Sequence, residues 1–290
     1  MVDLARQAWH GNALSYSGYR AGQSPATSVY PTQGQVLEDL RIVARNWPLI
    51  RVYSADQHGQ DVLEVIRREK LPLQVMLGVW IDGRADHVEK TAAQVAAGIR
   101  LANEYREIVA AVNVGDEALA SWSAHKTTEA SLVQHVRTVK QAVRCPVTVA
   151  DDWAYWREPT AKLVAGVDFI AMHSYPVWNK HDVDTAMPAT ISNYESVRKA
   201  HPDKTIVITQ AGWPSETAGV PFVPGAGSEQ KQKRYDEELS AWAKAIGVTV
   251  FIFEAFDEPW KGAGTEGHWG LFTETRRAKL VTQGLFPDLR

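Results

Sequence analysis

The sequence predicts a single (β/α)8 barrel that takes up residues 1–290 as one domain. Eight short apolar runs alternate with amphipathic segments, as in repeated right-handed βαβ units. The chain's 290 residues suit a barrel, which typically needs ~250. The runs are almost continuously apolar, as in parallel sheets buried on both faces. The alternative is an open doubly wound sheet, but no Gly-x-Gly-x-x-Gly follows the first strand.

The expected strands are short and rich in Val, Ile and other apolar residues. The first is followed by a loop rich in Gly, Ser and Pro at residues 18–31. The seventh ends in Gln210, a small-residue turn and Trp213-Pro214. Strands are expected at residues 13–17, 49–53, 73–80, 108–114, 147–150, 168–172, 205–209 and 248–253.

Helices are expected between these strands, where apolar residues recur every three or four positions. The first begins after Thr32, which forms a capping-box pattern with Gln35. A final helix or tail closes the chain after residues 270–272. The other helices are expected at residues 60–70, 87–106, 128–143, 159–165, 189–200 and after Ser228.

The composition excludes several classes of function. A net charge of −3 gives no electrostatic basis for binding nucleic acid or an anionic membrane. Cys145 is the only cysteine, so neither an internal disulfide nor a thiolate metal cluster is possible, and we expect a buried, unreactive thiol. The 9 His form no His-x-His or His-Glu-x-x-His pattern, which argues against a metal-dependent hydrolase.

Polar and aromatic residues follow the expected strands at their carboxyl ends, where barrel enzymes place their catalytic groups. Asp, Glu, Tyr and Trp dominate there, with few cations. Carboxylates and amides bind sugar hydroxyls, and aromatic faces stack on sugar rings, whereas a phosphate substrate would call for a basic rim. The 11 Trp fit this interpretation because several of them stand at strand ends.

Two of these residues suggest a reaction. Glycoside cleavage with retention needs two carboxyl groups ~5–5.5 Å apart, one acting as acid/base and one as nucleophile. Glu117 follows the fourth strand and Gln210 ends the seventh, and these strands lie roughly across the barrel mouth. Alone, Glu117 could be a helix-start charge and Gln210 a polar turn residue. The pair is more telling than either residue.

At this point the sequence resembles a known family. Gly115-Asp116-Glu117 resembles the Gly-Asn-Glu of retaining glycosidases built on this barrel. Residues 208–215, Ile-Thr-Gln-Ala-Gly-Trp-Pro-Ser, resemble the Glu-x-Gly-Trp-Pro-Ser signature of glycoside hydrolase family 17. Residues 253–261 and 268–272 resemble its strand-eight and closing motifs, so the similarity covers nearly the whole chain. The resemblance implies action on β-1,3-glucans, without a cofactor, as an endohydrolase or a glucanosyltransferase.

The resemblance assigns the acid/base role to Glu117 and the nucleophile role to position 210, where the chain departs from the family. A Gln cannot ionise or form a glycosyl ester. Our hypothesis is a deliberate Glu→Gln substitution that holds intact substrate, and the alternative is a natural pseudoenzyme that only binds glucan. A second departure is Asp116, where the related glycosidases have an Asn that donates a hydrogen bond to the sugar 2-hydroxyl. An ionised Asp there would instead accept a hydrogen bond from that hydroxyl.

Further site residues are expected around this pair. Tyr175 would bind and orient the nucleophile, unless it only packs at the barrel mouth. Glu254 and Glu258 would bind sugar hydroxyls, unless they form salt bridges with Arg51 or Lys261. Aromatic faces for sugar stacking, each with core packing as its alternative, are expected at Tyr53, Trp153, Trp178, Trp213 and Trp260.

The expected protein is a retaining β-1,3-glucan-active enzyme, and we favour transglycosylation over hydrolysis because the loops are compact. A non-catalytic glucan-binding protein is the alternative from another class. We expect a monomer that binds glucan oligo- or polysaccharide and no metal. Residues 1–7 lack the apolar core of a secretory signal and no run could span a membrane. The substrate class nevertheless implies a periplasmic or extracellular location, so we expect an excised domain of a larger protein.

Overall fold

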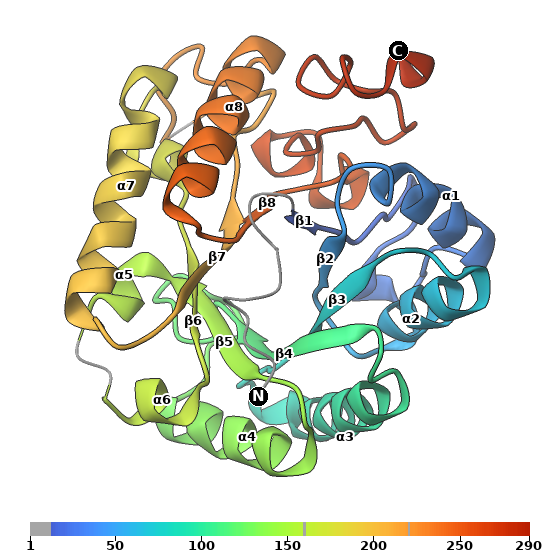
Figure 1. The fold of residues 1–290 in the computed structure, drawn as a ribbon, viewed down its shortest axis with the longest axis vertical. Coiled ribbons are helices and arrows are strands. Elements are labelled where there is room, and N and C mark those ends of the chain that lie inside the picture. The colour runs from blue at the N-terminus through green and yellow to red at the C-terminus, as the bar shows by residue number, and fades with distance from the viewer. Residues whose placement is uncertain (1–12, 159–160, 220) are drawn as a thin grey trace.

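The computed structural model describes residues 13–158, 161–219 and 221–290. Within them, eight parallel strands close into a barrel in the order β1 to β8, which confirms the predicted (β/α)8 fold (Figure 1). Each strand pairs with the next along the chain, and β1 pairs with β8 to close the ring. The strands are β1 Ala13–Ser15, β2 Leu49–Val52, β3 Gln74–Val79, β4 Val109–Asp116, β5 Val147–Asp152, β6 Ile170–His173, β7 Ile206–Ala211 and β8 Val250–Ile252.

Helices surround the barrel on its outer side (Figure 1). They are α1 Gln33–Val43, α2 Gln57–Glu69, α3 Val88–Glu104, α4 Glu129–Ala142, α5 Trp153–Trp156, α6 Ala161–Gly166, α7 Val183–Ala200 and α8 Glu229–Ile246. The predicted capping box is present at α1, where Thr32 and Gln35 bond to each other's backbone N–H. No α-helix follows residues 270–272, so the closing segment is a tail of turns with a short 3-10 helix at Pro287–Leu289.

Two helices begin earlier than predicted because aspartates cap them. Asp56 accepts hydrogen bonds from the backbone N–H groups of His58 and Gly59 at the start of α2. Asp182 caps α7, which then continues through Pro188 instead of starting after it. The helix predicted at 159–165 corresponds to α6, with residues 159–160 outside the described residues, whereas α5 was not predicted. Residues 1–7, used above to argue against a signal, also lie outside them.

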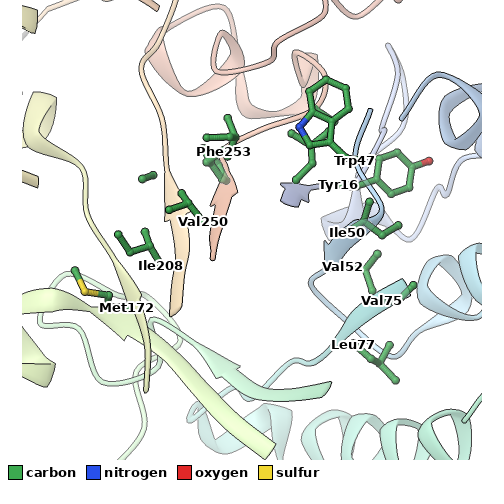
Figure 2. Close-up of a cluster of buried hydrophobic side chains, with 14 of the residues drawn as sticks. Tyr16, Trp47, Ile50, Val52, Val75, Leu77, Met172, Ile208, Val250 and Phe253 are labelled. Carbon is green, nitrogen blue, oxygen red and sulfur yellow. The ribbon is translucent and has the colours of Figure 1, made fainter. Parts of the chain in front are cut away.

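The core has two parts, separated by the wall of the barrel. The larger part lies between strands and helices, and Figure 2 shows side chains of this cluster such as Ile50, Val75 and Ile208. The smaller part groups buried residues of alternate strand positions, among them Ala13, Leu49 and Phe251. The two parts together seal both faces of each strand, as the continuously apolar runs predicted.

Polar side chains replace apolar ones towards the carboxyl ends of the strands. Successive strand residues point to opposite faces, so Ser15 and Arg51 share a face with Ala13 and Leu49, two positions earlier. Both polar side chains are fully buried. The base of the barrel is therefore apolar, and its carboxyl-terminal end is lined by polar groups.

Candidate active site

Glu117 stands immediately after β4 on a bent backbone. Gly115 has φ +87° and Glu117 itself has φ +48°, a left-handed conformation that is uncommon for non-glycine residues. The Glu117 N–H donates to the Ala150 carbonyl at 2.9 Å, which ties the bend to β5. The Glu117 side chain is 27% exposed, and its Oε1 lies 2.9 Å from His173 Nδ1 at the end of β6. The bend thus turns the carboxyl group towards the barrel mouth.

Gln210 lies in β7 and is 5% exposed. The Tyr175 hydroxyl donates to Gln210 Oε1 at 2.5 Å, as predicted for a residue that orients position 210. Burial raises the pKa of Tyr175 well above its usual value, so the phenol keeps its proton and remains a donor. Gln210 Nε2 points the other way, 3.4 Å from Asp116 Oδ1.

The strand-seven signature needs its glycine for a close approach between backbones. A Cβ on Gly212 would lie 2.0 Å from the Phe253 carbonyl oxygen, so no side chain fits there. The N–H of Phe253 in turn donates to the Ala211 carbonyl at 2.8 Å. The end of β7, with Gln210, is therefore fixed against the segment that follows β8.

Asp116 joins three elements of the site. Its Oδ1 accepts a 2.6 Å hydrogen bond from Arg51 Nη2 on β2 and lies 3.6 Å from His173 Nε2 on β6. Burial disfavours the ionised form of Asp116, but the charges of Arg51 and His173 outweigh it and hold the pKa of Asp116 below its usual value. Asp116 is therefore an ionised acceptor between Glu117 and Gln210.

Lys261 lies between the two strand-eight carboxyl groups. Its Nζ is 2.8 Å from Glu254 Oε1 and 2.6 Å from Glu258 Oε2, and the Ser17 hydroxyl donates to the other Glu258 oxygen. Burial and the neighbouring Glu258 raise the pKa of Glu254 well above its usual value. Burial also penalises the ionised Glu258, yet Lys261 and Ser17 bring its pKa below the usual value. The ionised form is therefore favoured at Glu258 and disfavoured at Glu254, although Lys261 contacts both carboxyl groups.

The salt-bridge alternative weighed for Glu254 and Glu258 is therefore realised with Lys261. Arg51 pairs with Asp116 instead. Tyr53 follows β2 directly, with its ring 4.8 Å from the Arg51 guanidinium, and its buried hydroxyl has no hydrogen-bond partner among the described residues. Burial and the charge of Glu254 raise the pKa of Tyr53, so this hydroxyl keeps its proton.

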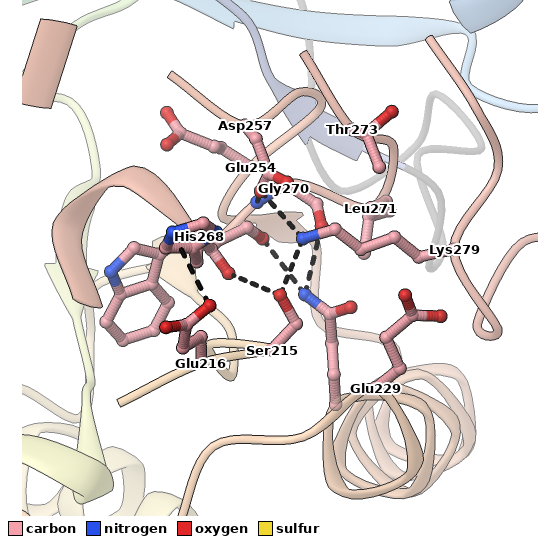
Figure 3. A network of polar contacts seen from close by, with 12 residues as sticks. Ser215, Glu216, Glu229, Glu254, Asp257, His268, Gly270, Leu271, Thr273 and Lys279 are labelled. Carbon is pink, nitrogen blue, oxygen red and sulfur yellow. Dashed lines mark hydrogen bonds and ion pairs between the residues drawn. The ribbon is translucent and has the colours of Figure 1, made fainter. Parts of the chain in front are cut away.

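A polar network supports the loops that follow β7 and β8. Lys279 Nζ donates to Ser215 Oγ at 2.7 Å and to Asp257 Oδ1 at 2.6 Å (Figure 3). Gln232 of α8 donates to the carbonyls of Trp213, Trp269 and Gly270. The closing tail therefore braces the Trp-Pro-Ser segment and the strand-eight segment against each other.

The predicted aromatic platforms divide into exposed and buried rings. Trp260 is 38% exposed, whereas Trp213 is 1% exposed and donates its Nε1–H to the Ala226 carbonyl. Trp213 packs against Tyr235 in the core, so it offers no face to a sugar and its prediction as a platform is wrong. Trp153 and Trp178 are half-buried, the latter packed against Trp269 and Phe222.

Four polar residues of this site were not among the predicted site residues: Ser17, Arg51, His173 and Lys261. Each contacts a predicted site carboxyl group, as described above. His173 ends β6 and Arg51 lies one residue from the end of β2, so their positions gave a signal. No signal in the sequence, however, indicated that His173 would contact Glu117 or that Arg51 would contact Asp116. Among the described residues, no group of three or more His, Cys, Asp or Glu is arranged to hold a metal ion.

Comparisons with known proteins extend this picture. The family model of the BtgE/BtgC glycoside hydrolase domain matches residues 13–270. A glucan 1,3-beta-glucosidase of Arthroderma benhamiae is 25% identical over 281 residues, covering 91% of this chain and 89% of that protein. The glucan endo-1,3-beta-glucosidase btgC of Emericella nidulans is 26% identical over 276 residues, which cover 86% of this chain. The chain spans only 42% of that longer relative.

A solved structure agrees over most of the chain. The endo-laminarinase from Formosa Hel1_33_131 superposes with a TM-score of 0.84 at 27% sequence identity. The match covers 96% of this chain and 86% of that one. No helix in the described part of the chain has both the length and the hydropathy needed to cross a membrane.

Proposed function

Because the chain belongs to the BtgE/BtgC glycoside hydrolase domain family, we propose that it is built for retaining chemistry on β-1,3-glucans. The family match confirms the resemblance drawn from the strand-seven and strand-eight motifs. Glu117 is the acid/base in this proposal, and position 210 is the place of the nucleophile. The observation that carries it is the placement of Gln210, held by Tyr175 on one side and by Asp116 on the other.

In the first step, Glu117 gives its proton to the glycosidic oxygen as the bond to the anomeric carbon breaks. A carboxylate at position 210 attacks that carbon from the opposite face and forms a glycosyl ester. The departing sugar leaves with the proton as a free hydroxyl. Tyr175 holds the attacking group in place, and its hydrogen bond to an ionised acceptor is a strong one.

In the second step, Glu117 takes a proton from the incoming group, which attacks the ester and releases position 210. Water gives hydrolysis, and a sugar hydroxyl gives transfer. We favour transfer because two of the loops at the mouth are compact: β5 runs directly into α5, and only residues 53–56 separate β2 from α2. Hydrolysis is the second candidate, since the named relatives are glucosidases and a laminarinase.

The chain with Gln210 lacks the ionisable nucleophile that these steps need. An amide of nearly the same shape accepts from Tyr175 and donates to Asp116, but it forms no ester. We propose that Gln210 replaces a Glu, and that the chain with Gln210 binds glucan without appreciable turnover. A natural glucan-binding pseudoenzyme is the competing explanation. The proposed substrate places the protein outside the cytoplasm, and we propose that it works there as a monomer.

The Gln210→Glu variant tests these alternatives on β-1,3-glucan oligosaccharides of defined length. Products longer than the donor would support transfer, and exclusively shorter products would support hydrolysis. A variant that still binds the oligosaccharide but is inert from neutral to alkaline pH would overturn the enzymatic proposal. Gln60→Glu is the matched control, because Gln60 lies in α2 and contacts Arg100 on the outer surface. It makes the same chemical change away from the barrel mouth.

A further inference from the structure

The contact between Asp116 and Gln210 reverses the polarity that the family resemblance implies. In the family, an amide stands at position 116 and a carboxyl group at position 210. Here the carboxyl group is Asp116 and the amide is Gln210, with 3.4 Å between Oδ1 and Nε2. The donor and acceptor have exchanged places across the same contact. A carboxylate at position 210 would instead put two oxygens against each other at this spacing.

Asp116 has no freedom to give up its charge in favour of position 210. The same Oδ1 accepts from the fully buried Arg51, whose Nε and Nη1 have no hydrogen-bond partner among the described residues, so a turn of Asp116 would leave the guanidinium without a hydrogen bond. Burial alone would favour a neutral Asp116, but Arg51 and His173 keep its pKa below the usual value. The proton of a carboxyl pair would therefore reside at position 210.

We propose that Asp116 is a positioning residue that sets the charge of the nucleophile position, so that a carboxylate at position 210 ionises only at a raised pH. This inference rests on the proposed function. Like charges within hydrogen-bond distance disfavour each other's ionised form. The donor Tyr175 acts in the opposite direction, because it stabilises the ionised form. The titratable and charged groups around the pair are Arg51, Tyr53, Glu117, His125, His173, Tyr175, Glu254 and Lys261.

The consequence is that full restoration of the site needs two changes. In the Gln210→Glu variant alone, the acid limb of the pH profile of kcat/KM lies at a higher pH than it would without the charge of Asp116. The double variant Asp116→Asn/Gln210→Glu places a neutral amide at position 116 beside a carboxylate at position 210. Its acid limb lies at least about one pH unit lower, because a like charge within a few Å raises a carboxyl pKa by that much or more. Below this limb, each pH unit that separates the two variants corresponds to about a tenfold difference in the ionised fraction.

A carbon-13 titration measures this charge directly. Glutamate labelled at Cδ adds one resonance to the Gln210→Glu variant that the chain with Gln210 lacks, which assigns it to position 210. We expect its titration midpoint to fall by at least about one pH unit on adding Asp116→Asn. It should stay in place with Asp288→Asn, the same change at an exposed residue paired with Arg45. An unchanged midpoint in the Asp116→Asn double variant would overturn the inference.

A second variant covers the case in which Asp116→Asn does not fold. Asp116→Ser in the Gln210→Glu background also removes the carboxylate, so the midpoint at position 210 should again fall, and an unchanged midpoint would overturn the inference. Activity separates this inference from the function on which it rests. An active Gln210→Glu variant with a midpoint insensitive to Asp116 leaves the function standing and rejects the inference. An inert Gln210→Glu variant whose midpoint responds to Asp116 rejects the proposed function and supports the charge coupling between positions 116 and 210.

Discussion

The Tyr175 hydroxyl donates a 2.5 Å hydrogen bond to Gln210 Oε1 across the ends of β6 and β7. The phenol keeps its proton because burial raises its pKa, so the direction of this bond is fixed. The chain therefore presents a donor to the place where a nucleophilic carboxylate would stand. A donor is of little use to an inert amide but stabilises and orients a carboxylate.

Tyr175→Phe in the Gln210→Glu background removes this donor without changing the ring. We expect kcat/KM on β-1,3-glucan oligosaccharides to fall about 10- to 100-fold, since hydrogen bonds to charged groups are worth ~1.5–3 kcal/mol. Tyr235→Phe is the control, because its hydroxyl is also buried but bonds to Thr190 between α7 and α8. A loss of similar size in Tyr235→Phe would mean that the effect reports folding and not orientation.

The two strand-eight carboxyl groups should respond differently to neutralisation. Glu258→Gln leaves the buried Lys261 without its ionised partner and should destabilise the fold by ~3–5 kcal/mol. Glu254→Gln replaces the group whose ionised form is disfavoured by burial and by Glu258, so it should cost less than Glu258→Gln. Urea unfolding of both variants at pH 7 compares the free energies of unfolding. The reverse order would show that Glu254 is the ionised member of the pair.

Asp151 should make stability depend on pH between the ordinary carboxyl range and neutrality. Burial raises its pKa to about 7, even though the N–H groups of Leu119 and Asp152 donate to it. In the unfolded chain it ionises near pH 4, so between these values the folded state binds more protons and stability falls as pH rises. The total loss is on the order of a few kcal/mol and is complete above pH 7.

Asp151→Asn removes this titration. We expect its free energy of unfolding, measured from pH 4 to pH 8, to decline less steeply than that of the parent chain. A parallel decline in both proteins would assign the pH dependence to other groups. Asp168, which pairs with Lys140 on the exposed side of the barrel, offers the same substitution as a control.

Substitutions of the buried Trp213 and the exposed Trp260 should affect different properties, stability for the first and glucan binding for the second. Trp213→Ala removes a ring from the core and should lower the free energy of unfolding by ~3–5 kcal/mol. Trp260→Ala removes a ring that is 38% exposed, so stability should change little. If Trp260 stacks on a glucosyl unit, its loss should weaken laminari-oligosaccharide binding about 5-fold or more, as measured by calorimetry. Unchanged affinity would remove Trp260 from the sugar-binding surface.

Much of this molecule could be predicted because its fold follows from local patterns. Eight apolar runs alternating with amphipathic segments predicted the barrel and located Glu117, Tyr175 and Gln210 at strand ends. Helix starts were less certain, because the caps Asp56 and Asp182 place the starts of α2 and α7 earlier than the apolar spacing indicated. In both cases the capping contact is local, but an Asp in a loop can also have other roles, so the sequence alone does not identify it as a cap.

The contacts across the mouth could not be predicted in the same way. Arg51 on β2 reaches Asp116 on β4, and nothing in the sequence pairs residues on strands that are not neighbours. The burial of Trp213 likewise depends on the carbonyl of Ala226 in the following loop. Both outcomes follow from how far side chains reach in the folded barrel.

Trapping the glycosyl ester would show directly whether position 210 is the place of the nucleophile. A slow substrate such as a 2-deoxy-2-fluoro-β-laminaribiosyl fluoride accumulates this ester, and intact and peptide mass spectrometry then locate it. We expect a stoichiometric sugar adduct on the peptide containing position 210 in the Gln210→Glu variant, and none in the chain with Gln210. A sugar adduct on any other residue, or turnover of glucan by Gln210→Glu without an adduct at position 210, would contradict this role.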